Sequence, residues 1–364
     1  MDRLPRRTLG LIIASLAVLG LLSNDASAGR DRFAHALGDA MLRWAATLDE
    51  EQRDRARYAF DDEERFDLRL APIGLEGLRI DEMSDNQWQM LHAALGQVLS
   101  EEGLQKVDTI RSLEREVAEL ENWFVSFVMG DFRDPGRYFL ALFGEPSSEQ
   151  VWGMRFDGHH LSLNWTAIPG APLSVTPLFL GGQPREVPGG LERAGLRVLA
   201  KEEDRAVALV RSLSQEQRSA AAIPFAGGSA FRRPMFVGDG PEISLDAPAG
   251  IARTVLGPEQ RGLLDALVDV YLANFARPLA DRHREQMQAE AQSVHFAYAA
   301  GGNSEERGLR AGDPFYYRIQ SESFLIEFDD TSAAADHVHV VWREIQADFG
   351  RDALAKHYRA HHAH

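Results

Sequence analysis

The chain has 364 residues, a formal net charge of −16 and no cysteine. This acidic balance disfavours nucleic acid and anionic membrane surfaces as partners. The lack of cysteine excludes disulfides, thiolate metal ligands and a lipid-modified cysteine, so any metal site must use His, Asp or Glu.

The N-terminus has the layout of a secretory signal peptide. Arg3, Arg6 and Arg7 precede an apolar run at 9–22, and the small residues Ala-Ser-Ala follow at 26–28. The run is too short to span a bilayer comfortably, so we expect cleavage after position 28 and export of a soluble chain to the periplasm or beyond. Removing 1–28 leaves a net charge of about −17. Export by the Sec or the twin-arginine route stays open, because the arginine pair matches only part of the twin-arginine pattern.

The mature chain also contains similar segments in its two halves. Its roughly 336 residues exceed the usual size of one compact core, which favours two lobes. Three first-half stretches have second-half counterparts: LDEEQR (48–53) and LSQEQR (213–218), MSDNQWQMLHAAL (83–95) and VLGPEQRGLLDAL (255–267), WGMRFDGHHLSLNW (152–165) and FYYRIQSESFLIEF (315–328). Chance similarity of amphipathic segments is the alternative. We predict an α+β fold with two pseudo-repeated halves, 29–180 and 213–364, joined by a connecting segment at 181–212.

Each half is predicted to run from helices into an antiparallel β meander. Apolar residues at helical spacing, and alternating apolar and polar residues at strand spacing, define the elements. In the first half they predict helices at 31–46, 84–101 and 104–122, then strands at 138–143, 151–157, 160–165 and 174–180. In the second half they predict helices at 258–272 and 277–291, strands at 294–299, 315–320, 324–328 and 337–342, and a last helix at 345–358.

The strongest candidate site lies in the last two strands, FLIEFDDTSAAADHVHVVW. His337 and His339 leave the same face of an extended strand, since successive residues alternate faces. Glu327 and Asp329 lie at the end of the neighbouring strand, so their carboxylates can converge on the imidazoles. Two His and a carboxylate form a common first shell for zinc, iron, manganese or copper. A polar layer in which these histidines only form hydrogen bonds is the alternative.

Further candidates come from the first-half hairpin and from the second-half strand that precedes the site. We predict that His159 contributes a metal ligand and that His160 transfers protons, although a turn histidine bonded to backbone is an equal alternative. Arg318 is a candidate for orienting an anionic substrate, and an inter-lobe salt bridge is the alternative. The tail histidines, at 357, 361, 362 and 364, are attributed to a frayed terminus.

The order of these motifs resembles a known family. FDGHHLSLNW, TPLFLGGQP, FYYRIQ, FLIEFDDT and DHVHVVWREIQADFG are similar to segments of the exported bacterial and fungal family catalogued as domain of unknown function 3500. Members usually have Asn and Ser where this chain has Asp336 and Val340. The resemblance covers nearly all of the mature chain and implies membership without an activity.

Two classes of function remain open. The first is a metal-dependent extracytoplasmic enzyme, with a hydrolase favoured, acting on a small molecule or peptide. The second is a non-catalytic protein that binds a metal or a solute. Nucleophile elbows, phosphate loops and His-Glu-x-x-His helices are missing from the sequence, which leaves the common hydrolase and nucleotide-binding classes without support.

Overall fold

The computed structural model describes most of the chain after the N-terminal segment. The described residues are 34–69, 74–120, 133–228, 235–238, 240, 242–243, 247–302, 304, 308–332 and 335–361. The predicted signal peptide lies outside them. Within these residues, no helix combines the length and the apolar character that crossing a membrane requires.

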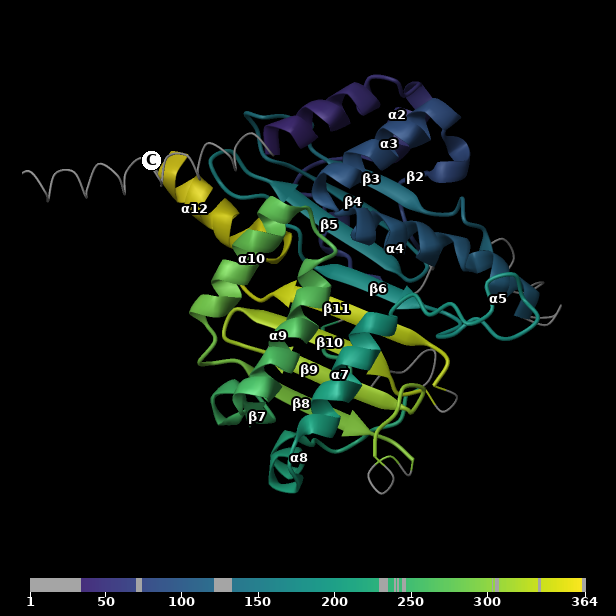
Figure 1. The fold of residues 1–364 in the computed structure, drawn as a ribbon. Coiled ribbons are helices and arrows are strands. Elements are labelled where there is room, and N and C mark those ends of the chain that lie inside the picture. Colours follow the sequence, from purple (N-terminus) through teal and green to yellow (C-terminus); the bar gives the residue numbers. More distant parts are fainter. Residues whose placement is uncertain are drawn as a thin grey trace, which may run out of the picture.

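A single mixed sheet forms the centre of the molecule (Figure 1). Its long strands are β3 (Phe139–Phe143), β4 (Trp152–Gly158), β5 (Leu161–Ala167), β6 (Leu178–Gly182), β8 (His295–Ala300), β9 (Phe315–Gln320), β10 (Phe324–Asp330) and β11 (Val338–Glu344). Two-residue strands β1 (Arg57–Tyr58), β2 (Leu78–Arg79) and β7 (Ile251–Ala252) lie at its edges. The order is β1-β3-β4-β5-β6-β11-β10-β9-β8-β7, with β2 also on β3, and only the β1–β3 ladder is parallel. The predicted α+β class and both antiparallel meanders are confirmed.

Most of the labelled helices lie on one face of this sheet, and α12 lies to one side of it (Figure 1). The labelled helices are α2 (Glu50–Ala56), α3 (Asp85–Val98), α4 (Glu101–Ser112), α5 (Glu114–Leu120), α7 (Ala200–Ser212), α8 (Gln215–Ala221), α9 (Pro258–Leu272), α10 (Arg277–Ala289) and α12 (Arg351–His361). Residues 34–45 form a further helix before α2. Helix α7 lies within the predicted connecting segment.

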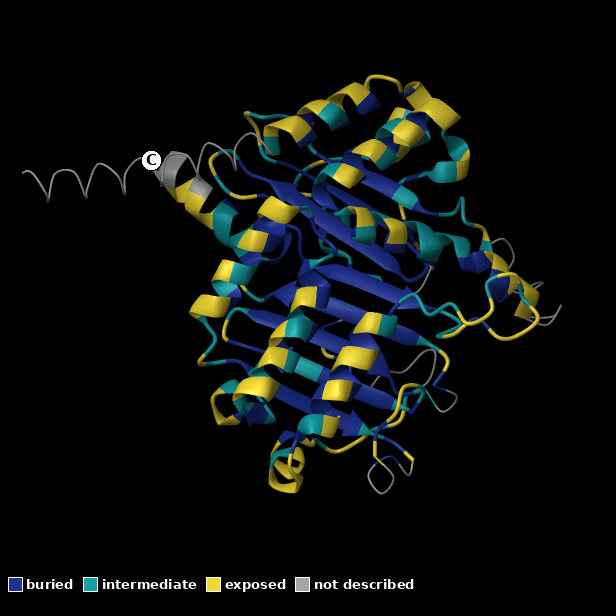
Figure 2. Cartoon of the chain, viewed as in Figure 1, coloured by how far each residue is buried: buried dark blue, intermediate teal, exposed yellow. Residues whose placement is uncertain are grey.

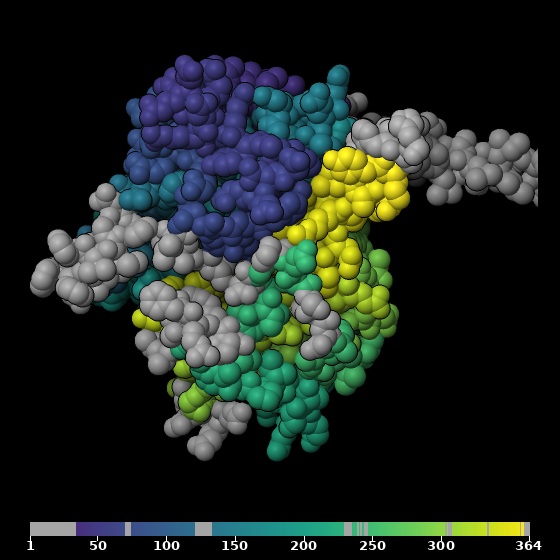
Figure 3. Space-filling view, turned by 180° about the vertical axis from the view of Figure 1, so that it is seen from behind, coloured from purple at the N-terminus to yellow at the C-terminus, as the bar shows by residue number. Residues whose placement is uncertain are grey.

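The two faces of the sheet have different chemistry. The helix-covered face carries large apolar side chains such as Trp152, Phe156 and Trp342, which belong to one continuous core. The opposite face carries buried polar groups such as Arg155 and Glu327. Both faces of the strands are buried (Figure 2), because irregular segments from both halves cover the polar one (Figure 3).

Side-chain caps explain where several helices begin. Asp49 and Ser214 cap α2 and α8, and each accepts a hydrogen bond from the backbone of the glutamine three residues later. The predicted helix starts at both EQR motifs are therefore confirmed. Ser100 caps α4 by accepting from the backbone of Gly103, so α3 ends at Val98 and α4 begins at Glu101, three residues before the predicted start at 104.

The end of the chain differs from its prediction. Strand β11 continues to Glu344, and α12 begins at Arg351, six residues after the predicted start. The Asp348 carboxylate accepts a hydrogen bond from the Glu344 backbone at 2.9 Å and holds the intervening turn, while Gly350 has a φ of +71°. The sequence pattern predicted helix too early because the helical spacing continued through this turn.

Each half contains one pair of glutamines whose side chains bond to each other. Gln52 and Gln87 exchange side-chain hydrogen bonds at 2.8 and 3.2 Å, and Gln217 and Gln260 do so at 2.7 and 2.9 Å. The sheet order also reads β3-β4-β5-β6 from one side and β8-β9-β10-β11 from the other, with β6 and β11 at the centre. The central strands place the first-half hairpin beside the start of β11.

Candidate metal centre

Three imidazoles gather where the two meanders meet. His159 and His160 form the turn between β4 and β5, and His337 comes immediately before β11. One ring nitrogen from each lies within 4.8 Å of the others. His159 and His160 are buried and His337 is half-buried, so the group has both a low-dielectric interior and a side near solvent.

Backbone geometry places His160 in this group. Its φ is +64°, a left-handed conformation that suits a tight turn, and its carbonyl accepts a hydrogen bond from the Gly181 backbone at 2.8 Å. The imidazole then lies directly over Gly181. A Cβ at that position would approach the ring Cδ2 to 2.8 Å, so β6 needs glycine where it passes beneath His160.

His159 is oriented by its neighbours on the helix side. The Tyr138 hydroxyl donates to its carbonyl at 2.7 Å, and the Glu114 Oε1 atom lies 2.6 Å from its Nδ1 atom. A carboxylate oxygen can only accept a hydrogen bond, so this contact requires a proton on the Nδ1 atom of His159.

His160 and His337 face each other directly. Their Nε2 atoms are 2.5 Å apart, and their ring planes meet at 79°. Two lone pairs at this distance repel unless a proton or a cation lies between them. Tetrahedral zinc bonds of about 2.0–2.1 Å would hold such nitrogens about 3.3 Å apart, so an ion requires the two rings to separate by less than about 1 Å.

A fourth imidazole lies beside the three. The His339 ring centroid is 4.6 Å from that of His337 and 5.1 Å from that of His160. The His339 ring stacks on Phe179 at 5.5 Å and is fully buried. His339 is therefore adjacent to the three-nitrogen group without belonging to it.

The family comparison covers this entire arrangement. A family model described as "Protein of unknown function (DUF3500)" matches residues 31–351. The chain belongs to this family. All four histidines and Glu114 lie inside the matched region, and the resemblance inferred from the motifs is confirmed. The DUF3500 chain matches no curated protein and no solved structure.

Asp329 and Glu327, the two carboxylates predicted as metal ligands, contact other groups in this DUF3500 protein. Asp329 lies opposite His339 in the β10–β11 ladder and accepts a hydrogen bond from the Thr331 hydroxyl at 2.7 Å. The Glu327 carboxylate is fully buried and accepts hydrogen bonds from the backbone of Val237 and Gly238. Neither carboxylate is part of the group in which three ligand atoms converge.

Glu327 and Arg318 form a separate polar cluster. The Tyr316 hydroxyl donates to Glu327 at 2.5 Å, and Arg318 lies 3.8 Å from the same carboxylate. Burial raises the pKa of Glu327 to about 7, against the lowering effects of Tyr316, Arg318 and the two backbone donors. In this arrangement Glu327 anchors a covering segment, and Arg318 donates to the Tyr316 oxygen at 2.8 Å.

Glu114 and Gly181 are site residues that the sequence analysis missed. Glu114 starts α5 and looks like one more acid on a polar helix, while Gly181 is one of a glycine pair assigned to the connecting segment. Their roles depend on contacts with His159 and His160, which are 45 and 21 residues away along the chain.

Proposed function

We propose that this DUF3500 protein is an exported metal-dependent hydrolase whose divalent ion is held by His159, His160 and His337. The observation that carries the proposal is the convergence of three ring nitrogens within 4.8 Å at the junction of the two meanders. Three neutral nitrogen ligands leave a coordination position for water or substrate, as in catalytic zinc sites. The ion would lower the pKa of bound water toward neutrality and so supply a nucleophile.

The donor set narrows the choice of metal. Imidazole suits zinc, copper and iron, and thiolate is excluded because the chain has no cysteine. Hard, oxygen-preferring ions such as magnesium and calcium do not match an all-nitrogen group. Zinc is the ion that we propose first, and iron, manganese and copper are the others to test.

A non-catalytic metal carrier is the second candidate, and His339 is the observation that favours it. Its ring lies 4.6 Å from that of His337, so a rotation of these side chains would offer a fourth imidazole. Four protein ligands would close the site, whereas three leave it open. The number of bound nitrogens therefore separates the carrier from the enzyme.

Metal content is the first test. The mature protein would be purified with the tail histidines at 357, 361, 362 and 364 replaced by Ala, and its metal measured by mass spectrometry. We expect one ion per chain, lost in His337→Ala and retained in His92→Ala, whose ring instead pairs with Asp108 on the surface. Retention of the ion in His337→Ala, or its absence from every form, would refute the metal centre.

X-ray absorption of the loaded protein then distinguishes the two functions. Three nitrogens with one or two oxygens at the ion, together with hydrolysis of ester, phosphoester or peptide substrates by the loaded form alone, support the hydrolase. Four nitrogens with no hydrolysis support the carrier. A small molecule or a peptide is the proposed ligand in either case.

We also propose that the halves are pseudo-repeats of one ancestral unit. The mirrored strand order and the two reciprocal glutamine pairs support this. Gln87→Met and Gln260→Met should then lower the free energy of unfolding by similar amounts, about 1–3 kcal/mol each, because each removes the two hydrogen bonds with a half-buried partner glutamine. A loss in one variant alone would contradict the equivalence.

A further inference from the structure

A carboxylate on the helix side of the sheet connects the scaffold to the metal centre. Glu114 is 2 % exposed, and its Oε1 atom contacts the Nδ1 atom of His159 at 2.6 Å. We propose that Glu114 is a positioning residue, which fixes the tautomer of His159 and so presents the Nε2 atom of that ring to the ion. This role rests on the proposed metal centre, but the tautomer of His159 can be measured in the metal-free protein.

The surrounding charges fix the direction of this hydrogen bond. Arg133 lies 3.5 Å from the Glu114 Oε2 atom, within ion-pair distance. The Arg133 Nη1 atom also lies 2.8 Å from the Nδ1 atom and 3.3 Å from the Nε2 atom of His159. Because a carboxylate oxygen can only accept, Nδ1–H donates to Glu114, and Arg133 can then donate only to the Nε2 lone pair, where a bound ion would replace it.

The second half contains a natural comparison for Glu114. Glu290 follows α10, and its Oε2 atom accepts from the Ser321 hydroxyl at 2.6 Å and from the Ser323 backbone at 3.3 Å in the β9–β10 turn. Both glutamates therefore reach from a helix to the turn of a central hairpin. Glu290 accepts hydrogen bonds from a hydroxyl and a backbone amide, whereas Glu114 contacts an imidazole.

The two glutamates also occupy matched places along the chain. Glu114 lies fourteen residues after Ser100, and Glu290 lies fourteen residues after Ala276. The backbone N–H of Ser100 donates to the Asn274 carbonyl, and that of Ala276 donates to the Val98 carbonyl, so the two starting points face each other across the junction. We infer that anchoring a hairpin turn is the shared role of the carboxylate and that orienting a metal ligand is specific to Glu114.

Substitution of Glu114 should therefore change which nitrogen of His159 carries the proton, while the imidazole itself remains. A histidine ring with no acceptor at Nδ1 is free to carry its proton on Nε2, where it blocks the metal. Loss of such an outer partner typically lowers metal affinity 10–100-fold, and we expect an effect of about that size. Gln at position 114 keeps a carbonyl oxygen that can accept from Nδ1–H, so it should preserve most of the affinity that Ala loses.

The test combines two readouts on the full mature chain. Long-range proton–nitrogen NMR of the metal-free, ¹⁵N-histidine-labelled protein reports the tautomer of His159, whose signals are identified by their loss in His159→Ala. Zinc affinity is measured separately by competition with a chelator. The variants are Glu114→Ala, Glu114→Gln and the matched control Glu290→Ala, and far-ultraviolet circular dichroism checks that each one folds.

The expected results separate positioning from general support of the fold. Wild type and Glu114→Gln should show His159 protonated at Nδ1, while Glu114→Ala should show protonation at Nε2 and a 10–100-fold weaker affinity for zinc. Glu290→Ala should leave both readouts unchanged, although it removes the bonds to Ser321 and Ser323. An Nδ1–H tautomer that persists in Glu114→Ala would overturn the inference. If the tautomer changes as expected but the wild type binds no zinc, the proposed function fails and the positioning role stands.

Discussion

The Nε2 atom of His160 lies 2.5 Å from the Nε2 atom of His337, although 177 residues separate them along the chain. One ring belongs to the first meander and the other precedes the last strand of the second. The β6–β11 ladder is what brings them together, since it places the turn before β5 beside the start of β11. An ion between these rings would connect the two halves by side chains as well as by backbone.

Zinc should therefore stabilise the folded protein. An ion that binds only the folded state adds about 2.7 kcal/mol at a free concentration 100 times Kd, so the melting temperature should rise with zinc and fall again with a chelator. The tail histidines are replaced by Ala throughout. His337→Ala should lose the response and His92→Ala should keep it, as measured by thermal denaturation. An equal zinc response in both variants would contradict the assignment.

Gly181 provides a second way to displace a ligand without changing any histidine. Gly181→Ala would place a Cβ 2.8 Å from the His160 ring, so we expect the imidazole to move and zinc affinity to fall at least tenfold. Crowding of this kind also costs about 1–3 kcal/mol of stability. Gly189→Ala is the matched control, because a Cβ there meets nothing within 4 Å. Calorimetric titration with zinc would compare the two, and unchanged binding in Gly181→Ala would contradict the placement of His160.

The sequence was informative where local pattern determines structure. Alternating apolar residues predicted the strands around Trp152 and Phe324, and capping residues predicted the starts of α2 and α8, because both signals act within a few residues. The sequence alone makes His159, His160 and His337 candidates. Their grouping could not be predicted, because it depends on which strands become neighbours at the centre of the sheet.

The surroundings of the acidic side chains on β10 could not be predicted from strand pairing alone. Glu327 was placed near the histidines because β10 neighbours β11, and that pairing is confirmed. Glu327 precedes Asp329 by two residues on β10, however, and its carboxylate there accepts hydrogen bonds from the backbone of Val237 and Gly238. That Asp329, Glu327 and His339 are metal ligands, and that Arg318 orients a substrate, stay predictions. Long-range loop packing decides such contacts, and a single sequence carries no pattern for it.

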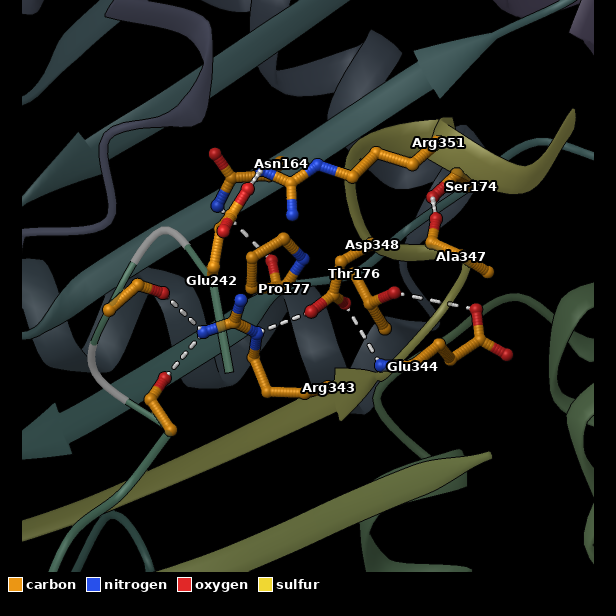
Figure 4. A network of polar contacts seen from close by, with 12 residues as sticks. Asn164, Ser174, Thr176, Pro177, Glu242, Arg343, Glu344, Ala347, Asp348 and Arg351 are labelled. Carbon is orange, nitrogen blue, oxygen red and sulfur yellow. Dashed lines mark hydrogen bonds and ion pairs between the residues drawn. The ribbon is translucent and has the colours of Figure 1, made fainter. Parts of the chain in front are cut away.

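A buried arginine on the polar face should be important for stability. Arg343 donates to Asp348 at 2.5 Å and to the carbonyls of Gly238 and Gly240 at 2.7 and 2.6 Å (Figure 4). Arg343→Met leaves the Asp348 charge buried without its main partner, so the free energy of unfolding should fall by about 3–5 kcal/mol. Urea denaturation measures this loss.

Two further variants test the cause of that loss. Asp348→Asn added to Arg343→Met should recover part of the stability, because the unpaired buried charge is then removed. Arg351→Ala, which removes an arginine 3.7 Å from the exposed Glu242, should cost less than about 1 kcal/mol. Equal losses for Arg343→Met and Arg351→Ala would show that burial of the ion pair is not the cause.

Glu327 should make the stability depend on pH in an unusual direction. Burial raises the pKa of its carboxyl from 4.5 to about 7 in the folded protein, so the folded state binds this proton more tightly than the unfolded chain does. The stability that this group contributes is therefore fully present below pH 4.5 and is lost as the pH rises to about 7. Glu327→Gln carries no such titration, so its stability relative to wild type should rise between pH 5 and pH 8, by up to about 3 kcal/mol. Urea denaturation at both pH values measures the difference, and Glu322→Gln, at an exposed position in the β9–β10 turn, should show no comparable change. A constant difference between Glu327→Gln and wild type across this range would mean that the folded and unfolded chains bind the proton equally, and that the carboxylate is ionised beneath Val237 and Gly238 at both pH values.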